Sequence, residues 1–522
     1  MRFCRLFQTL RHIPPKQLFW QVFRFFFNKS PSKKIYKFHF SARSLRVVSS
    51  SYSKVDDNNV FIFGSKLKII SSKLPSDIKQ DYLYDFSYNY LDFIFSPKLH
   101  LDDALEFIEN YPNENNRFEW HPYTVSKRLI NLICFCVVNF ENIPKNKIEN
   151  IENQASRMYG FLKENIEFHL GANHVLTNYA ALSIAQLFIK ENTCSNAPSY
   201  IDLYIEQYNL QFSKDIHYER SVAYSRQLLS EFLLVAQFYN ELKNEFFFEK
   251  NSKIIDSISA LDSLGSMFGD NILEQSPNLS DISDQFFCVY QRPPLKKTDK
   301  KKYDIEGYYL LESNGFKALI DAGEPSPKNN PGHAHDSTGA FSISVEGLPL
   351  IVNGIVSTYE RCDRRIEERS RLVYSKPQNM GVAQETWASF RVASRRKPQC
   401  LDVENGVLIN VYTSNDGFQR GVFETPQGLT MFDKMLNPEG SKIISQFIIS
   451  PDFKIEEHID NKLTLRHKSS RIRVLLSYSK ETKLKNKNVI LGVGYGKTKM
   501  HEALLLEGFG KELNLNITKE YS

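Results

Sequence analysis

The sequence has little net charge and no long apolar run. Its 522 residues include 66 Lys and Arg against 60 Asp and Glu, so the net charge is only +6. A balance this close to neutral does not mark a nucleic-acid-binding protein, although it would suit an acidic substrate. The longest apolar stretch, residues 129–140, is too short to cross a bilayer. We therefore expect neither bound nucleic acid nor a membrane-spanning helix in this stretch.

A disulfide framework and an export signal are also missing. Seven cysteines, an odd number, are scattered along the chain without the spacing of a zinc site, which favours a reducing compartment. Near the start, basic residues interrupt every apolar stretch, whereas a secretory signal needs an apolar core of about 7–15 residues. We expect a cytoplasmic protein or one peripheral to the inner membrane, and the periplasm is less favoured.

One aromatic and basic segment near the start allows two interpretations. Residues 17–27 read QLFWQVFRFFF. Such a stripe can lie on a membrane surface or dock on a partner. It can also pack against its own domain, which is the commoner outcome for an apolar helical face.

The hydrophobic pattern divides the rest of the chain. Between about residues 78 and 266 apolar residues recur at helical spacing, for example in residues 159–168, 175–189 and 228–238. After about residue 285 the pattern changes to short strand-like runs separated by Gly, Asn or Pro. We therefore predict an N-terminal segment (residues 1–50), a layer of helix hairpins (residues 51–280) and a β-sandwich or similar sheet stack (residues 281–522).

Three clusters of polar residues could carry chemistry. Asn173 and His174 stand at the predicted start of a helix, where they could face a cleft and bind an anion, or where Asn173 could simply cap the helix. Tyr224 lies near Arg220 and Arg226. A tyrosine with a pKa of about 10 is a poor base unless cations lower that value, and the alternative is a tyrosine that packs between helices.

The third cluster contains two histidines. His333 and His335 alternate by two and share a face if the chain is extended. They could bind a metal, act in acid–base catalysis, or form ordinary polar surface.

In this order, the motifs resemble those of the heparinase II/III family of polysaccharide lyases, from about residue 84 to about residue 450. The matching segments are residues 120–131 (WHPYTVSKRLIN), 171–178 (GANHVLTN), 217–224 (HYERSVAY), 332–352 and 387–392 (WASFRV). Residues 9–18 (TLRHIPPKQL) are similar to the start of family members encoded with surface-polysaccharide synthesis enzymes. The resemblance implies an incomplete (α/α) toroid followed by a C-terminal antiparallel β-sandwich, with a cleft between them that unites the three clusters.

The resemblance also implies a reaction, β-elimination on a uronic acid. Asn173 and His174 would neutralise the uronate carboxylate, Tyr224 would act as base, acid or both, and His333 would be the second acid–base group. Further substrate contacts would come from Trp120, Tyr123, Asn178, His217, Arg220 and Arg226, and the two arginines are added as cations that could also lower the tyrosine pKa.

A metal site is expected to be weak or absent, and no cofactor is required. Some family members hold a structural metal on a histidine equivalent to His335, an aspartate and a further histidine. The last two positions are occupied here by Asn353 and Gln378, which are poor ligands for a divalent ion. His335 would then serve mainly in packing or hydrogen bonding.

Three functions remain open at this point. The first is a lyase acting on an acidic surface polysaccharide or its lipid-linked precursor. The second is a catalytically inactive glycan-binding or assembly protein of a capsule or O-antigen pathway. The third, supported least, is a hydrolase using the same cleft.

Overall fold

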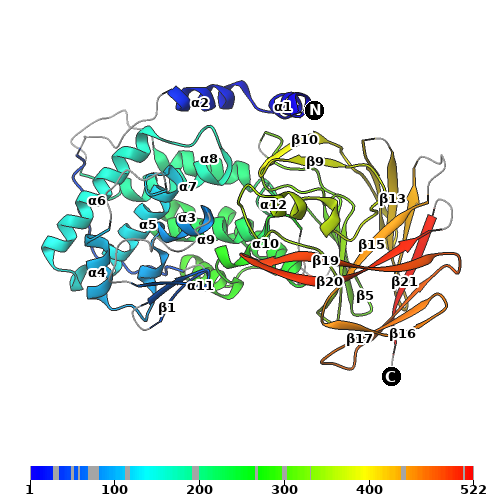
Figure 1. Ribbon diagram of the computed structural model, residues 1–522. Coiled ribbons are helices and arrows are strands. Elements are labelled where there is room, and N and C mark those ends of the chain that lie inside the picture. The colour runs from blue at the N-terminus through cyan, green and yellow to red at the C-terminus, as the bar shows by residue number, and fades with distance from the viewer. Residues whose placement is uncertain are drawn as a thin grey trace.

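The computed structural model describes residues 2–26, 35–48, 52–56, 59–68, 82–111, 118–190, 199–264, 268–296, 302–329, 331–414, 416–436, 442–508 and 512–520. Figure 1 shows helices gathered on one side and sheets on the other, with the first two helices lying across the top of the view. The predicted order of a helical toroid followed by an antiparallel β-sandwich is confirmed.

The helical domain is built around three helices that are buried on nearly every face. α5, α7 and α9 contact one another in that order and form the inner layer. α6, α8, α10 and α11 pack against them. A helix that is buried all round has to lie inside a domain, which explains its nearly continuous apolar sequence. The helices are α3 (Tyr82–Tyr88), α4 (Leu101–Glu109), α5 (Pro122–Val138), α6 (Lys145–Glu164), α7 (Ala172–Gln186), α8 (Tyr200–Gln211), α9 (Val222–Phe238), α10 (Glu245–Asp262) and α11 (Leu279–Tyr290).

Two features of this domain differ from the expectation. A small antiparallel sheet of β1 (Ser53–Asp56), β2 (Asn59–Ile62) and β3 (Ser65–Lys68) precedes the helices. Phe63 and Gly64, both with positive φ, form the two-residue turn between β2 and β3. At the other end, α11 packs on α9 and α10, so the helical layer continues to Tyr290, ten residues beyond the expected boundary at 280.

The second domain contains two eight-stranded sheets in which every recorded strand pair is antiparallel. Apolar side chains from both sheets meet in one core, as the alternation of buried and exposed residues requires. The first sheet runs β11 (Gln399–Val403), β12 (Gly406–Tyr412), β13 (Gly417–Thr425), β14 (Gly428–Met435), β21 (Glu512–Glu520), β18 (Arg473–Tyr478), β17 (Lys462–His467), β16 (Phe453–Ile459). The second runs β19 (Lys483–Gly494), β20 (Lys497–Glu507), β15 (Ile444–Ile449), β8 (Leu348–Val352), β7 (Phe341–Val345), β6 (Phe316–Asp321), β5 (Tyr308–Ser313), β4 (Lys302–Ile305).

The N-terminal helices connect the two domains (Figure 1). α1 (Arg2–Leu10) contacts β10 (Arg391–Arg395), which pairs with β9 (Gln384–Trp387) in a separate two-stranded sheet. α2 (Pro15–Phe26) contacts the loop before α7, where the side chain of Gln17 donates a hydrogen bond to the carbonyl of His169.

Two sequence expectations can be compared directly with the described residues. Six of the seven cysteines lie among them, and all six are free thiols; Cys194 lies outside the described residues. None of the described helices is long and apolar enough to cross a bilayer.

Candidate active site

A cavity of about 390 Å³ is lined by residues of both domains. The three clusters singled out in the sequence meet here, since Asn173, His174, Tyr224 and His333 all line it. A second hollow of about 420 Å³ shares Arg361 and Phe390 with the first and extends it along the β domain. The remaining lining residues of the first cavity are mostly aromatic or polar: Tyr52, Tyr82, Leu83, Phe86, Tyr90, Asp92, His121, Tyr123, Lys127, Leu170, Glu219, Gln227, Gln275, Gly332, Tyr359.

Tyr224 and His333 pack against each other across the domain boundary, with their rings tilted. Their ring centroids are 4.6 Å apart, with 46° between the ring planes. Ser221 caps α9 by accepting a hydrogen bond from the Tyr224 backbone N–H, which fixes the first turn of the helix. Burial, the neighbouring Tyr359 and the Asp270 carboxylate raise the pKa of Tyr224 well above its usual value. Tyr224 therefore carries its proton in the free protein.

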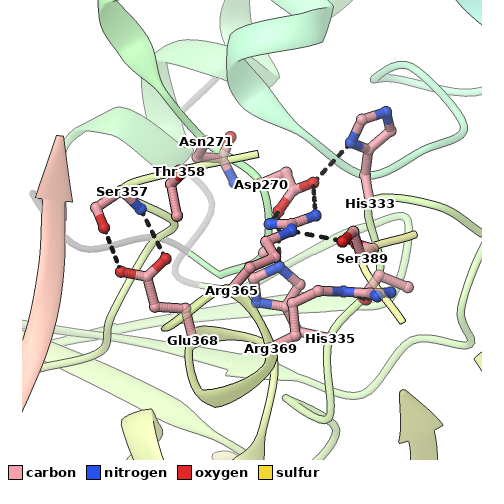
Figure 2. A network of polar contacts seen from close by, with 12 residues as sticks. Asp270, Asn271, His333, His335, Ser357, Thr358, Arg365, Glu368, Arg369 and Ser389 are labelled. Carbon is pink, nitrogen blue, oxygen red and sulfur yellow. Dashed lines mark hydrogen bonds and ion pairs between the residues drawn. The ribbon is translucent and has the colours of Figure 1, made fainter. Parts of the chain in front are cut away.

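Asp270 is the centre of the polar network behind this pair (Figure 2). One carboxylate oxygen, Oδ2, lies 2.7 Å from His333 Nδ1, and the other, Oδ1, lies 2.7 Å from His335 Nε2. Arg365, in α12 (Asp363–Glu368), donates to both oxygens at 2.6 and 2.7 Å. Asp270 lies between α10 and α11 of the helical domain, so this single carboxylate ties the helical domain to the β domain.

The conformation of Gly269 allows this approach. Its φ is +76°, and a side chain there would lie 3.3 Å from the backbone carbonyl of His333. The next residue but one, Asn271, accepts hydrogen bonds from the backbone N–H groups of Val222 and Ala223 at the start of α9. Residues 269–271 therefore contact both the start of α9, which carries Tyr224, and His333, and they fix the positions of these two residues relative to each other.

The charges in this network set the protonation of His333. Burial would raise the pKa of Asp270, but Arg365 and the two histidines hold it well below its usual range. The ionised carboxylate accepts the Nδ1 proton of His333, which leaves Nε2 as the reactive nitrogen. Burial lowers the pKa of His333, yet the carboxylates of Glu219 and Asp270 outweigh it and the net shift is upward. The two carboxylates thus favour a proton on the imidazole, which makes His333 a group that can take up a proton.

Asn173 and His174 line the same cavity. The chain reaches them through Gly171 and Ala172, both with positive φ, so Asn173 is the second residue of α7 and not its cap. His174 Nδ1 lies 3.1 Å from Oε2 of the buried Glu167, and its ring packs 4.7 Å from that of Tyr123. The Asn173 amide and the outer nitrogen of His174 are thus placed to receive an anionic group.

Six residues were expected to contact substrate, and Tyr123 lines the main cavity. The other five do not line it and have partners elsewhere. Asn178 is fully buried and accepts a hydrogen bond from the Glu167 backbone at 2.9 Å, so it supports His174 from behind. Trp120 packs on Phe161, with ring centroids 5.2 Å apart.

His217 is also fully buried, and burial lowers its pKa to about 3. Its ring nitrogen Nε2 lies 3.0 Å from the Gln211 side chain. It is therefore a neutral core residue and not a substrate ligand.

The two arginines do not lower the pKa of Tyr224. Arg220 forms an ion pair with Asp321 at 2.6 Å and lies over the ring of Tyr308, and Arg226 pairs with Asp262. Each cation is already neutralised by a carboxylate, and the pKa of Tyr224 shifts upward instead. Tyr123, by contrast, lines the cavity and accepts a hydrogen bond from Gln227 at 2.9 Å.

The residues at the expected metal positions do not fit a metal ion. His335 has both ring nitrogens engaged, Nε2 with Asp270 and Nδ1 with the hydroxyl of Tyr374. Asn353 and Gln378 use their side-chain amides on backbone groups at 2.8–3.2 Å. Within the ranges that the structure describes, no three metal-ligating side chains gather into a site.

Several important residues were not predicted from the sequence. Asp270 stands in an ordinary connection between two helices, α10 and α11, and Arg365 belongs to a charged run that is typical of a solvated helix. Glu219 lies within a recognised motif, but its buried position in the cavity wall follows only from the fold. Burial raises the pKa of Glu219.

Comparison with known proteins agrees with this architecture. Residues 296–513 match the family model described as heparinase II/III-like, C-terminal. Among solved structures, heparinase III aligns with a TM-score of 0.66 and 14% identity over 87% of this chain and 79% of its own. The heparan sulfate lyase HepC from Pedobacter heparinus aligns with a TM-score of 0.57 and 13% identity over 88% and 80% of the two chains. The search of curated proteins gave no significant match.

Proposed function

We propose that this chain is a polysaccharide lyase acting on uronate-containing chains. Its residues 296–513 match the family model described as heparinase II/III-like, C-terminal. The observation that carries the proposal is the Tyr224–His333 pair, which lines one cavity together with Asn173 and His174. The similar solved proteins are named as a heparinase and a heparan sulfate lyase. The resemblance of the sequence motifs points to the same class of reaction.

The charge of the cavity supports an acidic substrate. Three histidines, Lys127 and Arg361 line it, against the acidic Asp92 and Glu219. Asp92 is already engaged, since its carboxylate accepts a hydrogen bond from Tyr52 at 2.6 Å. Lys127 lies 3.8 Å from the Glu231 carboxylate, so a carboxylate on the substrate would meet positive charge mainly at Arg361 and at the histidines when they are protonated.

The first step of the proposed reaction is neutralisation of the uronate carboxylate. Removing the C5 proton places negative charge on that carboxylate, so donors fixed there stabilise the transition state more than the ground state. Asn173 and His174 supply these donors. Glu167 holds His174 by its Nδ1 atom, 3.1 Å away, and directs the other ring nitrogen outward.

Proton transfer would then involve the facing pair. His333 in its neutral form accepts the C5 proton at Nε2, because Asp270 fixes its other nitrogen. Tyr224, which keeps its proton at rest, donates it to the departing 4-linked oxygen. The C4–O bond breaks, a C4=C5 double bond forms and no water is consumed. The products are one chain with a new reducing end and one chain that begins with an unsaturated uronate. The raised pKa of Tyr224 favours this assignment over a resting phenolate base.

The biological polymer is proposed to be a surface polysaccharide or its lipid-linked precursor, acted on in the cytoplasm or at the inner membrane. This proposal rests on the similarity of residues 9–18 to family members encoded with polysaccharide synthesis enzymes. The two adjoining hollows, which share Arg361 and Phe390, suit an extended sugar chain.

The test is incubation of the purified chain with a panel of uronate polysaccharides while ultraviolet absorbance is recorded. A lyase produces a conjugated unsaturated uronate and the absorbance rises. Mass spectrometry separates the candidates: elimination leaves the summed product mass equal to that of the substrate, whereas hydrolysis adds one water. Binding of a cognate polymer with no cleavage would favour the inactive glycan-binding protein instead.

A further inference from the structure

The N-terminal helices present an apolar face that the rest of the described chain does not cover. In α1, Phe3, Phe7 and Leu10 are exposed by 88%, 71% and 37%. Their spacing places them on one side of the helix. In α2, Phe19 and Val22 are exposed by 59% and 58%. We call these five residues the apolar face.

The opposite sides of both helices are firmly held. Thr9 accepts a hydrogen bond from the Trp387 indole at 3.1 Å, and Arg5 forms an ion pair with Glu385 at 2.8 Å. In α2, Gln17 accepts a hydrogen bond from the Asn329 side chain, and Trp20 packs on Phe168 with ring centroids 5.1 Å apart. Packing on the chain's own domains and an uncovered apolar face therefore occur together, on opposite sides of the same helices.

Positive charge surrounds this face. The first 55 residues contain no Asp or Glu. Arg11 and Lys16, at the turn between α1 and α2, are exposed. Partial burial and then the charges of Arg395, Arg11 and Lys328 lower the pKa of His12 in the same turn, so cations from the β domain join those of the turn.

We propose that α1 and α2 dock this protein on an anionic lipid surface. Flat-lying helices with aromatic side chains on one side and Lys and Arg beside them are suited to the boundary between lipid headgroups and acyl chains. The rings would enter the apolar layer and the cations would contact lipid phosphates. A soluble polyanion would use the cations but would leave the five apolar side chains in water, and it is therefore the weaker fit.

The test is flotation of the full-length protein with vesicles of phosphatidylcholine alone or mixed with phosphatidylglycerol. The wild type should float with the mixed vesicles, bind the neutral ones weakly, and detach as salt is added. The double variant Phe7→Ser/Phe19→Ser should bind at least about tenfold more weakly, because each ring contributes apolar burial. Arg11→Glu/Lys16→Glu should lose the preference for anionic vesicles.

The control variant is Phe246→Ser, which removes an equally exposed ring (60%) from α10 in the helical domain. It should float like the wild type. Both phenylalanine variants should cleave soluble oligosaccharide at the wild-type rate if the lyase activity exists, so this test is independent of the proposed reaction. Equal flotation of Phe7→Ser/Phe19→Ser and wild type would overturn the proposal. It would also be overturned if the wild type sedimented as a dimer and this double variant as a monomer, because the apolar face would then be an interface between two copies.

Discussion

Asp270 Oδ2 lies 2.7 Å from His333 Nδ1, and the same carboxylate is held by both terminal nitrogens of Arg365 (Figure 2). Through this contact, a residue of the helical domain, between α10 and α11, orients a histidine of the β domain against Tyr224. Asp270 is a positioning residue, because it acts on the reaction through His333.

Replacing Asp270 should change the pH dependence of the reaction. Asp270→Asn removes a negative charge that raises the pKa of His333, so the acidic limb of the kcat/KM profile should move to lower pH. Activity should also fall by about 10²-fold or more, because the new amide presents a donor and no longer fixes the tautomer. The measurement is a pH profile of initial rates.

A matched control distinguishes positioning from simple destabilisation. Asp433 forms a similar buried pair with Arg420, at 2.6 and 2.7 Å, within the β domain and away from the cavity. Breaking such a pair costs roughly 3–5 kcal/mol of folding free energy. Asp433→Asn should therefore lower the melting temperature but leave the pH profile where it is. An identical shift of the profile in both variants would contradict the role given to Asp270.

Glu219 should limit stability while supporting the chemistry. Its pKa in the folded state is raised by burial, so folding becomes less favourable as pH rises from the unfolded pKa through the folded one. Glu219→Gln removes this loss of folding stability with rising pH, so it should raise the melting temperature at neutral pH but not at low pH. It should also lower the pKa of His333 and shift the acidic limb of kcat/KM downward.

The comparison variant for Glu219 is Glu481→Gln, an exposed glutamate in the β domain. It should alter neither the melting temperature nor the pH profile. A Glu219→Gln protein that is less stable than wild type at neutral pH would show that the carboxylate is compensated by a partner.

Asn173 should recognise the substrate carboxylate and little else. A hydrogen bond to a charged group contributes about 1.5–3 kcal/mol, so Asn173→Ala should lower kcat/KM on a uronate polymer by about 10–100-fold. On a polymer whose carboxyl groups have been reduced to alcohols, wild type and variant should be equally poor. An equal loss on both polymers would place Asn173 in a structural role.

Removal of divalent metal should leave the protein unchanged. His335 already donates to Asp270 and accepts from Tyr374, and burial lowers its pKa to about 4. A chelator should alter neither activity nor melting temperature, and His335→Ala should mainly reduce stability. Elemental analysis that finds one tightly held ion per chain after chelation would contradict this prediction.

The sequence predicted the elements whose pattern is local and missed the contacts between distant ones. The helical spacing of residues 175–189 and the strand pair 341–352 both appear in the structure, since each depends on neighbours in the chain. Motif order also brought Tyr224 and His333 to one site. Asp270 and Arg365 are 95 residues apart, and only the packing of the two domains joins them.

Charged residues near a motif were the least predictable. Arg220 and Arg226 flank Tyr224 in sequence, but the fold provides Asp321 and Asp262 as their partners. The β1–β3 sheet was missed because its strands have four residues each, too short for an alternating pattern to stand out.

The most direct test of the account is the formation of unsaturated product by wild type and by Tyr224→Phe on one cognate uronate polymer, with binding of each measured by calorimetry. Phenylalanine keeps the ring that packs on His333 and removes only the hydroxyl. We predict unchanged folding, binding close to that of wild type, and a rate of product formation lower by about 10²–10⁴-fold. Product formation by Tyr224→Phe at the wild-type rate would contradict the central claim that Tyr224 and His333 carry out the elimination.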